Sequence, residues 1–243
     1  MIKIFDSIEK INIFAAEKTV EIAGASIRSK GRFTIALAGG STPKMLYQML
    51  SSDEYKNKID WSNVFFFLGD ERMFSPASEE SNYWMACENL FAPLKITDEN
   101  VFRWRTELQN GEKIAADYEK TIKIFFDLNE NEFPRFDLIL LGMGDDGHTA
   151  SLFPFTDALN ETAKFAVANP VKKLETTRLT FTFPVINNAA NVIFLVKGCD
   201  KAETLSKVLS SEFQPDKFPS QSVKPANGNL FWLVDEAAAQ FLK

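Results

Sequence analysis

The sequence has very few residues of the types that commonly bind metal ions. Among its 243 residues are one histidine and two cysteines, Cys87 and Cys199. The cysteines lie far apart and lack the spacing of metal ligands, so we expect no metal site and two reduced thiols in a reducing compartment.

Long apolar runs are also missing. No run reaches the length of a transmembrane helix. Asp6 and Glu9 within the first ten residues are not typical of a signal peptide. We therefore expect a cytoplasmic protein that does not enter a membrane.

Positive charge is in the minority. Lys and Arg number 27 against 33 Asp and Glu, which gives a net charge of −6. Such a surface has no general attraction for nucleic acid or anionic lipid. If the ligand is an anion, a few local cations must overcome the overall field.

What is present is a pattern of short apolar runs, each followed by a Gly- or Asp-rich turn. Non-alternating runs of this kind are typical of parallel strands covered on both faces. The sequence therefore predicts an α/β fold, doubly wound, with a mostly parallel sheet and helices on both faces in a Rossmann-like three-layer sandwich. We expect a single domain over 1–243. The predicted strands are 33–38, Val64–Leu68, 136–141 and 192–196, and the predicted helices include 7–29, stopped by Gly31, 113–126, and one after each of the first, second and fourth strands.

In doubly wound sheets, ligands bind beyond the carboxyl ends of the strands. The loops that follow the four strands should therefore be considered together. They span 39–43, 69–72, 142–154 and 197–201 and contain most of the unusual polar residues. Their predicted convergence is the main argument for a site.

The first loop reads Gly-Gly-Ser-Thr-Pro. Its glycines allow the backbone to approach a ligand closely. Ser41 or Thr42 can cap the next helix, and Pro43 suits its first turn. A helix N-terminus binds phosphate readily, so Gly40, Ser41 and Thr42 are candidate contacts. An ordinary capped turn would have the same sequence.

Two further cations are candidate phosphate contacts. In the fourth loop, Asp200 can cap a helix with Glu203 completing a capping box. Lys201 would then lie in the first turn, where a cation is unfavourable unless an anion is bound. Arg178 can bind phosphate through paired hydrogen bonds. Solvated side chains are the alternative for both cations.

The second loop brings Asp70 and Arg72 to the same predicted edge. Two acids and a guanidinium can orient a sugar hydroxyl or tune a neighbouring imidazole. A solvated turn with a local ion pair is the alternative.

The third loop contains the only histidine, His148. Its Gly-Met-Gly-Asp-Asp-Gly segment matches a dinucleotide fingerprint, but Pro154 interrupts the chain where the required helix should run. We expect the glycines instead to let the backbone turn so that His148 lies in the crevice at the carboxyl ends of the strands. Imidazole changes charge near neutral pH, and no serine elbow is present, so a water-activating base is favoured over a covalent serine mechanism. Asp146 either strengthens this base or caps the turn.

Together these segments resemble the 6-phosphogluconolactonase family, within the glucosamine-6-phosphate isomerase/6-phosphogluconolactonase superfamily. The matching segments are GGSTP at 39–43, DER at 70–72 with SN at 81–82, LGMGDDGHTASLFP at 141–154, RLT at 178–180, GCDKA at 198–202 and NGNLFWLVD at 227–235. Two departures stand out. The family often has a proline-rich stretch where this chain reads KKLETT at 172–177, and often an arginine where it has Ser222.

The resemblance implies hydrolysis of 6-phosphoglucono-1,5-lactone in the pentose phosphate pathway, with no metal and no other cofactor. By position, His148 would be the base and Asp70 and Arg72 further site residues. The phosphate contacts would be Ser41, Thr42, Arg178 and Lys201, and Gly40 would be a further substrate-binding residue.

Two rival functions remain open. A hexosamine-phosphate deaminase/isomerase shares the fold, but it carries an acid soon after the histidine, whereas this chain has none until Asp157. A non-catalytic sugar-phosphate sensor usually carries a DNA-binding helix-turn-helix, and this chain begins directly with the α/β pattern.

Overall fold

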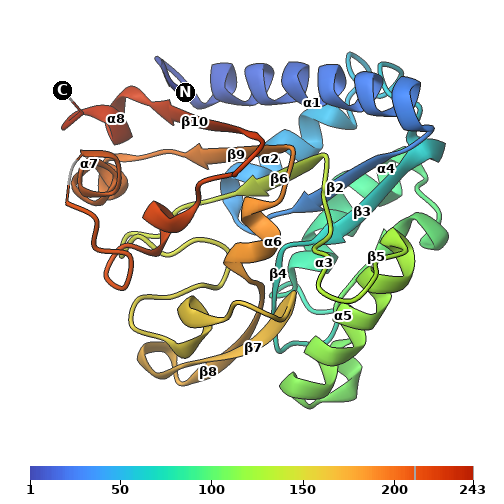
Figure 1. The fold of residues 1–243 in the computed structure, drawn as a ribbon. Coiled ribbons are helices and arrows are strands. Elements are labelled where there is room, and N and C mark those ends of the chain that lie inside the picture. The colour runs from blue at the N-terminus through green and yellow to red at the C-terminus, as the bar shows by residue number, and fades with distance from the viewer. Residues whose placement is uncertain (211, 243) are drawn as a thin grey trace.

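A computed structural model describes residues 1–210 and 212–242. The chain forms two sheets (Figure 1). The larger has seven strands in the order β1-β10-β9-β6-β2-β3-β5, and all of its pairings are parallel. The smaller has the order β4-β8-β7 and is antiparallel.

The strands are β1 Ile2–Phe5, β2 Phe33–Leu37, β3 Val64–Leu68, β4 Asp70–Arg72, β5 Val101–Phe102, β6 Leu138–Leu141, β7 Ala166–Val171, β8 Thr176–Phe181, β9 Asn191–Val196 and β10 Asn229–Asp235. The α-helices are α1 Ile8–Lys30, α2 Ser41–Leu50, α3 Asn82–Ala86, α4 Ala92–Leu94, α5 Gly111–Phe126, α6 Phe183–Asn187, α7 Ala202–Ser210 and α8 Glu236–Ala239. A π-helical turn, Cys87–Phe91, joins α3 to α4. No helix of the described ranges is both long and apolar enough to cross a bilayer.

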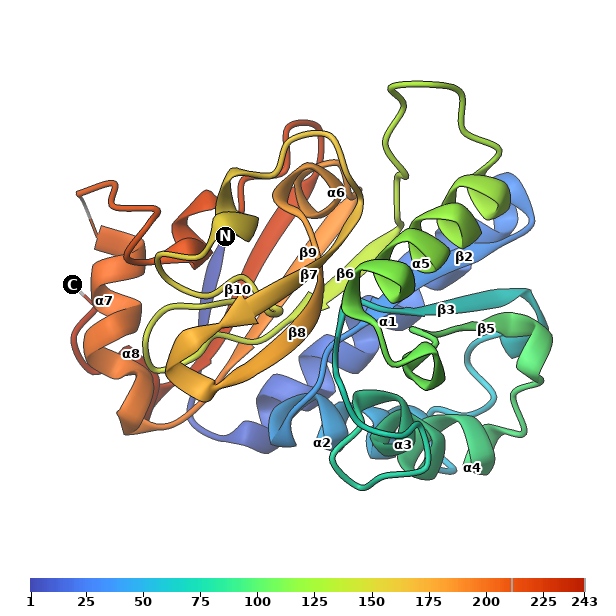
Figure 2. The ribbon, with the colours of Figure 1, turned by 90° about the horizontal axis from the view of Figure 1, so that it is seen from below.

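Helices cover both faces of the large sheet, as predicted. Side chains of adjacent strand residues point to opposite faces. The Phe66 ring contacts Phe91 at 5.1 Å between centroids, whereas the Phe67 ring contacts Phe125 of α5 at 5.2 Å. The π-helical turn and α5 therefore lie on opposite sides of β3 (Figure 2). Phenylalanine is common in this sequence because it fills these two layers.

The four predicted strands are confirmed as β2, β3, β6 and β9. Each is almost wholly buried, as expected for strands that are covered on both faces. The first helix is also confirmed. Ser7 accepts a hydrogen bond from the backbone N–H of Lys10, and Gly31 ends the helix at φ 73°. Glycine adopts this left-handed conformation without strain, so it stops the helix where expected.

The small sheet and its junction were not predicted. Gly69 lies between β3 and β4 and belongs to both hydrogen-bond networks. Its N–H donates to the carbonyl of Leu37 on β2 at 2.9 Å, and its carbonyl accepts from the N–H of Phe181 on β8 at 2.8 Å. The chain thus passes from one sheet into the other within one residue, at the carboxyl end of β3.

Candidate active site

A cavity of about 730 Å³ lies at the carboxyl ends of the large sheet. Three of the four predicted loops line it, together with Asp6, Ser7 and Asp235. Of the candidate phosphate contacts, it contains Gly40, Ser41, Thr42 and Lys201. The predicted convergence of these loops is therefore confirmed, while their binding role stays a prediction.

The first loop differs from its prediction in one respect. Gly40, not Ser41 or Thr42, is the N-cap of α2, with φ at 100°, and no side chain caps the helix. Glycine tolerates this conformation, so the helix begins one residue early and the hydroxyls of Ser41 and Thr42 lie in its first turn. Backbone N–H groups at this end are left for an anion.

The fourth loop also differs from its prediction. Asp200 does not cap a helix, because a 3₁₀ turn, Cys199–Lys201, precedes α7, and Gly198 is the N-cap of that turn. The Asp200 carboxylate instead lies 3.1 Å from Lys201 Nζ. The Gly198 N–H donates to Asp235 at the end of β10. The loop is therefore fixed by a neighbouring strand and not by a capping box.

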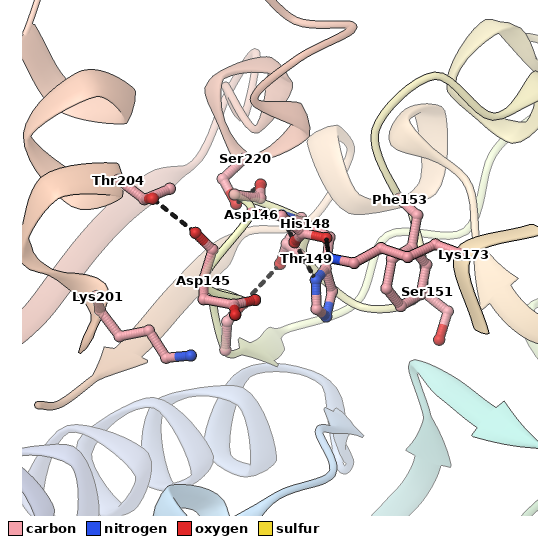
Figure 3. A network of polar contacts seen from close by, with 12 residues as sticks. Asp145, Asp146, His148, Thr149, Ser151, Phe153, Lys173, Lys201, Thr204 and Ser220 are labelled. Carbon is pink, nitrogen blue, oxygen red and sulfur yellow. Dashed lines mark hydrogen bonds and ion pairs between the residues drawn. The ribbon is translucent and has the colours of Figure 1, made fainter. Parts of the chain in front are cut away.

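The third loop holds His148 in a tight turn (Figure 3). The Asp146 carboxylate accepts from the His148 backbone N–H at 3.2 Å and lies 2.6 Å from Nδ1 of the imidazole. The carbonyl of Gly147 accepts two hydrogen bonds from Ser220. No long helix follows this turn in the described chain, as predicted from Pro154.

The imidazole is positioned on three sides. Phe153 stacks on it with centroids 4.1 Å apart and planes at 23°. A Cβ at Gly144 would lie 2.1 Å from Nδ1, so the ring occupies space that only glycine leaves free. An ionised Asp146 can only accept, so Nδ1 is the donor of this pair, and Nε2 is the nitrogen that carries a lone pair whenever the ring is neutral. No partner contacts Nε2 within the described ranges, and the side chain is 26% exposed.

Asp146 is held in its charged form. Burial favours the neutral acid, but hydrogen bonds from His148 and Lys173 and the charge on His148 outweigh it and hold the pKa of Asp146 well below its usual range. Lys173 Nζ lies 3.2 Å from Oδ2. Asp146 thus contacts both the imidazole and the backbone of the turn, and its effect on the base stays a prediction.

The second loop is not a solvated turn, which corrects that alternative. Asp70 to Arg72 form β4, and Glu71 between them is 2% exposed. Its carboxylate accepts from the backbone N–H groups of Arg72, Asn82 and Tyr83 and from the Ser81 hydroxyl. Burial of Glu71 is thereby compensated by hydrogen bonds.

Asp70 connects β4 to the histidine loop. Its Oδ2 accepts from the Ser151 hydroxyl at 2.7 Å, and its backbone carbonyl accepts from the side-chain amide of Asn82. Burial raises the pKa of Asp70, although Ser151 and the nearby arginines favour the charged form. Asn82 also packs under Gly39, where a Cβ would lie 2.1 Å from its Oδ1. One amide therefore joins the first and second loops.

Arg72 and Arg178 lie directly opposite each other on the β4–β8 ladder. Arg72 donates to the carbonyl of Glu80 at 2.9 Å. Burial and the charge of Arg72 lower the pKa of Arg178. Like charges directly opposite are destabilising, so this pair suits a bound anion. Neither arginine lines the 730 Å³ cavity.

Sequence analysis considered Glu71 only as one of two acids in its loop and did not select Ser151 or Lys173. Ser151 and Lys173 contact site residues that lie far away in sequence. The Ser81-Asn82 pair was a partial signal, as part of a matching segment. No group of three or more His, Cys, Asp or Glu in the part of the chain described here could hold a metal ion.

Comparison with known proteins identifies the family. The family model described as "Glucosamine-6-phosphate isomerases/6-phosphogluconolactonase" matches residues 7–232. A Nostoc protein named 6-phosphogluconolactonase is 41% identical over 213 residues, covering 88% of this chain and 86% of the relative. The chain therefore belongs to the glucosamine-6-phosphate isomerase/6-phosphogluconolactonase family.

Solved structures agree with the fold. The 6-phosphogluconolactonase from Trypanosoma cruzi has a TM-score of 0.89 and 30% identity, covering 100% of this chain and 96% of that chain. The enzyme of the same name from Trypanosoma brucei also has a TM-score of 0.89 and 30% identity, with 100% and 98% covered. The predicted α/β fold with a mostly parallel sheet is thus confirmed.

Proposed function

We propose that this protein hydrolyses 6-phosphoglucono-1,5-lactone to 6-phosphogluconate, as one catalytic domain. The observation that carries the proposal is the Asp146–His148 pair, in which Nε2 has no partner within the described ranges. His148 does not itself line the 730 Å³ cavity, but Gly142 and Met143 of its loop do. Relatives that cover most of this chain carry the lactonase name.

The phosphate group is proposed to bind at the N-terminus of α2. Backbone N–H groups and the Ser41 and Thr42 hydroxyls would donate to it, and Lys201 would supply a charge from the opposite side of the cavity. Arg178 would approach from β8. Anchoring the phosphate fixes the lactone carbonyl relative to His148, and such positioning supplies much of the acceleration in enzymes of this kind.

The chemistry then needs two proton transfers. Nε2 of His148 takes a proton from water as the water oxygen attacks the lactone carbonyl carbon. Asp146 stabilises the resulting imidazolium. The tetrahedral intermediate collapses by breaking the bond to the ring oxygen, which takes the proton back from Nε2 and becomes a hydroxyl. Water is thus added across the ester bond, and His148 returns to its neutral form.

Arg72 and Asp70 are proposed to support this reaction. The Arg72 guanidinium faces Arg178 and is available to the negative charge that develops on the carbonyl oxygen. Asp70 holds the Ser151 hydroxyl and so fixes the loop that follows His148.

This chain lacks, in the segment after the histidine, the proton-shuttling acid that the isomerase function would need. After His148 the chain reads Thr-Ala-Ser-Leu-Phe-Pro, and the next acid, Asp157, begins the 3₁₀ turn Asp157–Asn160. Among the described residues, Asp157 makes no hydrogen bond or ion pair with the imidazole. Lactone hydrolysis, which needs only one base, is therefore favoured.

The test is acid release from freshly prepared lactone, measured above the spontaneous rate. We expect His148→Ala to reduce kcat by about 10²–10⁴-fold, which is the usual contribution of a general base, while product affinity changes little. Arg178→Gln should mainly raise KM.

Three outcomes would count against the proposal. Near-normal turnover by the His148→Ala variant would exclude the mechanism. Sugar-phosphate binding without any acid release by the unaltered protein would indicate the sensor. Release of ammonia from a hexosamine phosphate would indicate the isomerase.

A further inference from the structure

The turn of the β7–β8 hairpin contacts the histidine loop through Lys173, in addition to the hydrogen bonds that Asn169 and Thr180 of the strands make with Ser151. β7 and β8 pair over six positions, from Ala166↔Phe181 to Val171↔Thr176, and the 3₁₀ turn Lys172–Leu174 connects them. Glu175 closes this turn at φ 49°. The ladder fixes where the turn lies, and Lys173 extends from it to Asp146 (Figure 3).

The two oxygens of Asp146 have different partners. Oδ1 faces the His148 ring at 2.6 Å, and Oδ2 faces Lys173 Nζ at 3.2 Å. One carboxylate is therefore shared between the imidazole and an ammonium group. The positive charge of Lys173 offsets part of the negative charge of Asp146. Asp146 therefore stabilises a protonated imidazole less than it would without Lys173.

We propose that Lys173 is a positioning residue that acts through Asp146 and makes His148 release its proton more readily. A base that activates water must be neutral at the working pH, and an unopposed Asp146 would favour the charged imidazolium. The positive charge of Lys173 reduces this preference of Asp146 for the imidazolium. The hydrogen bond and charge of Asp146 raise the pKa of Lys173, which agrees with a charged ammonium at this position.

Other charges around the imidazole are the same with and without Lys173. The segment that packs on the turn from the C-terminal side contributes the uncharged Phe218 and Ser220. The charged groups on the remaining elements are Asp145 in the same turn, Asp70 and Arg72 on β4, Arg178 on β8, Lys172 and Glu175 in the hairpin turn, Lys201 and Glu203 beside Thr204 of α7, which bonds the Asp145 carbonyl, and Asp216 and Lys217 next to Phe218. A substitution at position 173 therefore tests the effect of the Lys173 charge on His148, because these other groups stay in place.

The single histidine gives a direct measurement. Its imidazole proton signals in the untagged protein can come only from His148, so an NMR titration needs no assignment and no substrate. We expect Lys173→Met to raise the titration midpoint by about 0.3–0.5 pH unit at low salt, as for one charge about 6 Å away in a high-dielectric setting. Lys173→Glu should raise it further, and Lys173→Arg should restore the unaltered value.

Lys172→Met is the matched control. It removes the same charge from the same turn, and Lys172 has no ion-pair or hydrogen-bond partner for its side chain among the described residues. Its midpoint should rise by about half as much as that of Lys173→Met or less, because its charge lies farther from the imidazole and makes no pair with Asp146. Added salt at about 1 M should shrink the Lys173→Met effect, since the pair is 66% exposed on the lysine side.

An unchanged or lowered midpoint in Lys173→Met, or equal shifts in both lysine variants, would overturn the proposal. A second readout rests on the proposed function: the acidic limb of kcat/KM for lactone hydrolysis should move upward by the same amount. Loss of activity at all pH values with no displacement of the limb would also overturn it. If the protein does not act on the lactone, the NMR titration still decides the role of Lys173.

Discussion

Gly144 decides where the imidazole lies. A Cβ there would stand 2.1 Å from Nδ1 and 2.2 Å from Cε1 of His148. The glycine-rich turn was recognisable from the sequence, but this requirement was not. It depends on the return of the chain from Gly144 to His148, whose backbone groups bond at 2.9 Å.

Gly144→Ala should therefore displace the ring without abolishing the fold. We expect kcat for lactone hydrolysis to fall by about 10²-fold or more, because the base leaves its position. The histidine NMR signals should shift. Gly142→Ala is the structural control, since a Cβ there meets no atom within 4 Å. It should keep the unaltered NMR signals and Tm. Unaltered histidine signals in Gly144→Ala would contradict this account.

At the scale of elements, the pairing of β4 with β8 is the feature that sequence analysis could not supply. β4 has only three residues, all charged, and β7 contains Asn169 and Pro170. Such segments lack the apolar runs that reveal buried strands. Asp70, Arg72 and Arg178 were predicted as site residues, but nothing in the sequence indicated that they share a ladder. Their common ladder depends on an antiparallel register that local sequence does not encode.

That ladder predicts a phosphate-dependent stability. Arg72 and Arg178 repel each other when no anion lies between them, at a cost of about 0.2–1 kcal/mol for such pairs. We expect Arg178→Gln to leave Tm unchanged or slightly raised in phosphate-free buffer. Inorganic phosphate should raise the Tm of the unaltered protein with concentration, and much less that of Arg178→Gln. Thermal unfolding across a phosphate series measures both.

Arg105→Gln provides the comparison, because Arg105 pairs with Asp117 on the surface, away from the ladder. Its phosphate response should match that of the unaltered protein. Equal phosphate responses in Arg105→Gln and Arg178→Gln would show that Arg178 does not contact the anion.

For the whole molecule, four buried strands of the large sheet were predicted, whereas β10, an interior strand with a buried apolar run, was not, and neither were β1 and β5. β2, β3, β6 and β9 are buried on both faces, so their apolar runs identify them. β1 lies at an edge, with Ile2 and Ile4 exposed, and β5 has two residues. Edge and short strands depend on their neighbours for stability, so single-sequence patterns indicate them poorly.

The stability of the whole molecule should also depend on Asp70. Burial raises the pKa of Asp70, so the folded state binds this proton more tightly than the unfolded chain does. The folded state is therefore favoured at low pH, and the advantage is lost as pH rises through the raised pKa. Above the raised pKa a buried charge remains and lowers the free energy of unfolding.

Asp70→Asn removes that charge and leaves an acceptor for Ser151. We expect Tm at pH 7 to rise by about 2 °C, with the gain shrinking toward pH 4, while lactone turnover falls. Thermal unfolding at several pH values tests this. Asp157→Asn, at an exposed position, should show no such trend. A lower Tm at pH 7 for Asp70→Asn would contradict the argument.

Gly69 has a consequence for how this protein can change over evolution or in the laboratory. Because one residue bonds to both sheets, the base of the hairpin is held in place independently of its tip. The turn at 172–175 can then be lengthened, shortened or recharged while the arginine ladder stays in register. Substitutions in the hairpin turn can thus change the charge near His148 while the strands stay in place. Libraries confined to these four positions are a route to variants with an altered working pH.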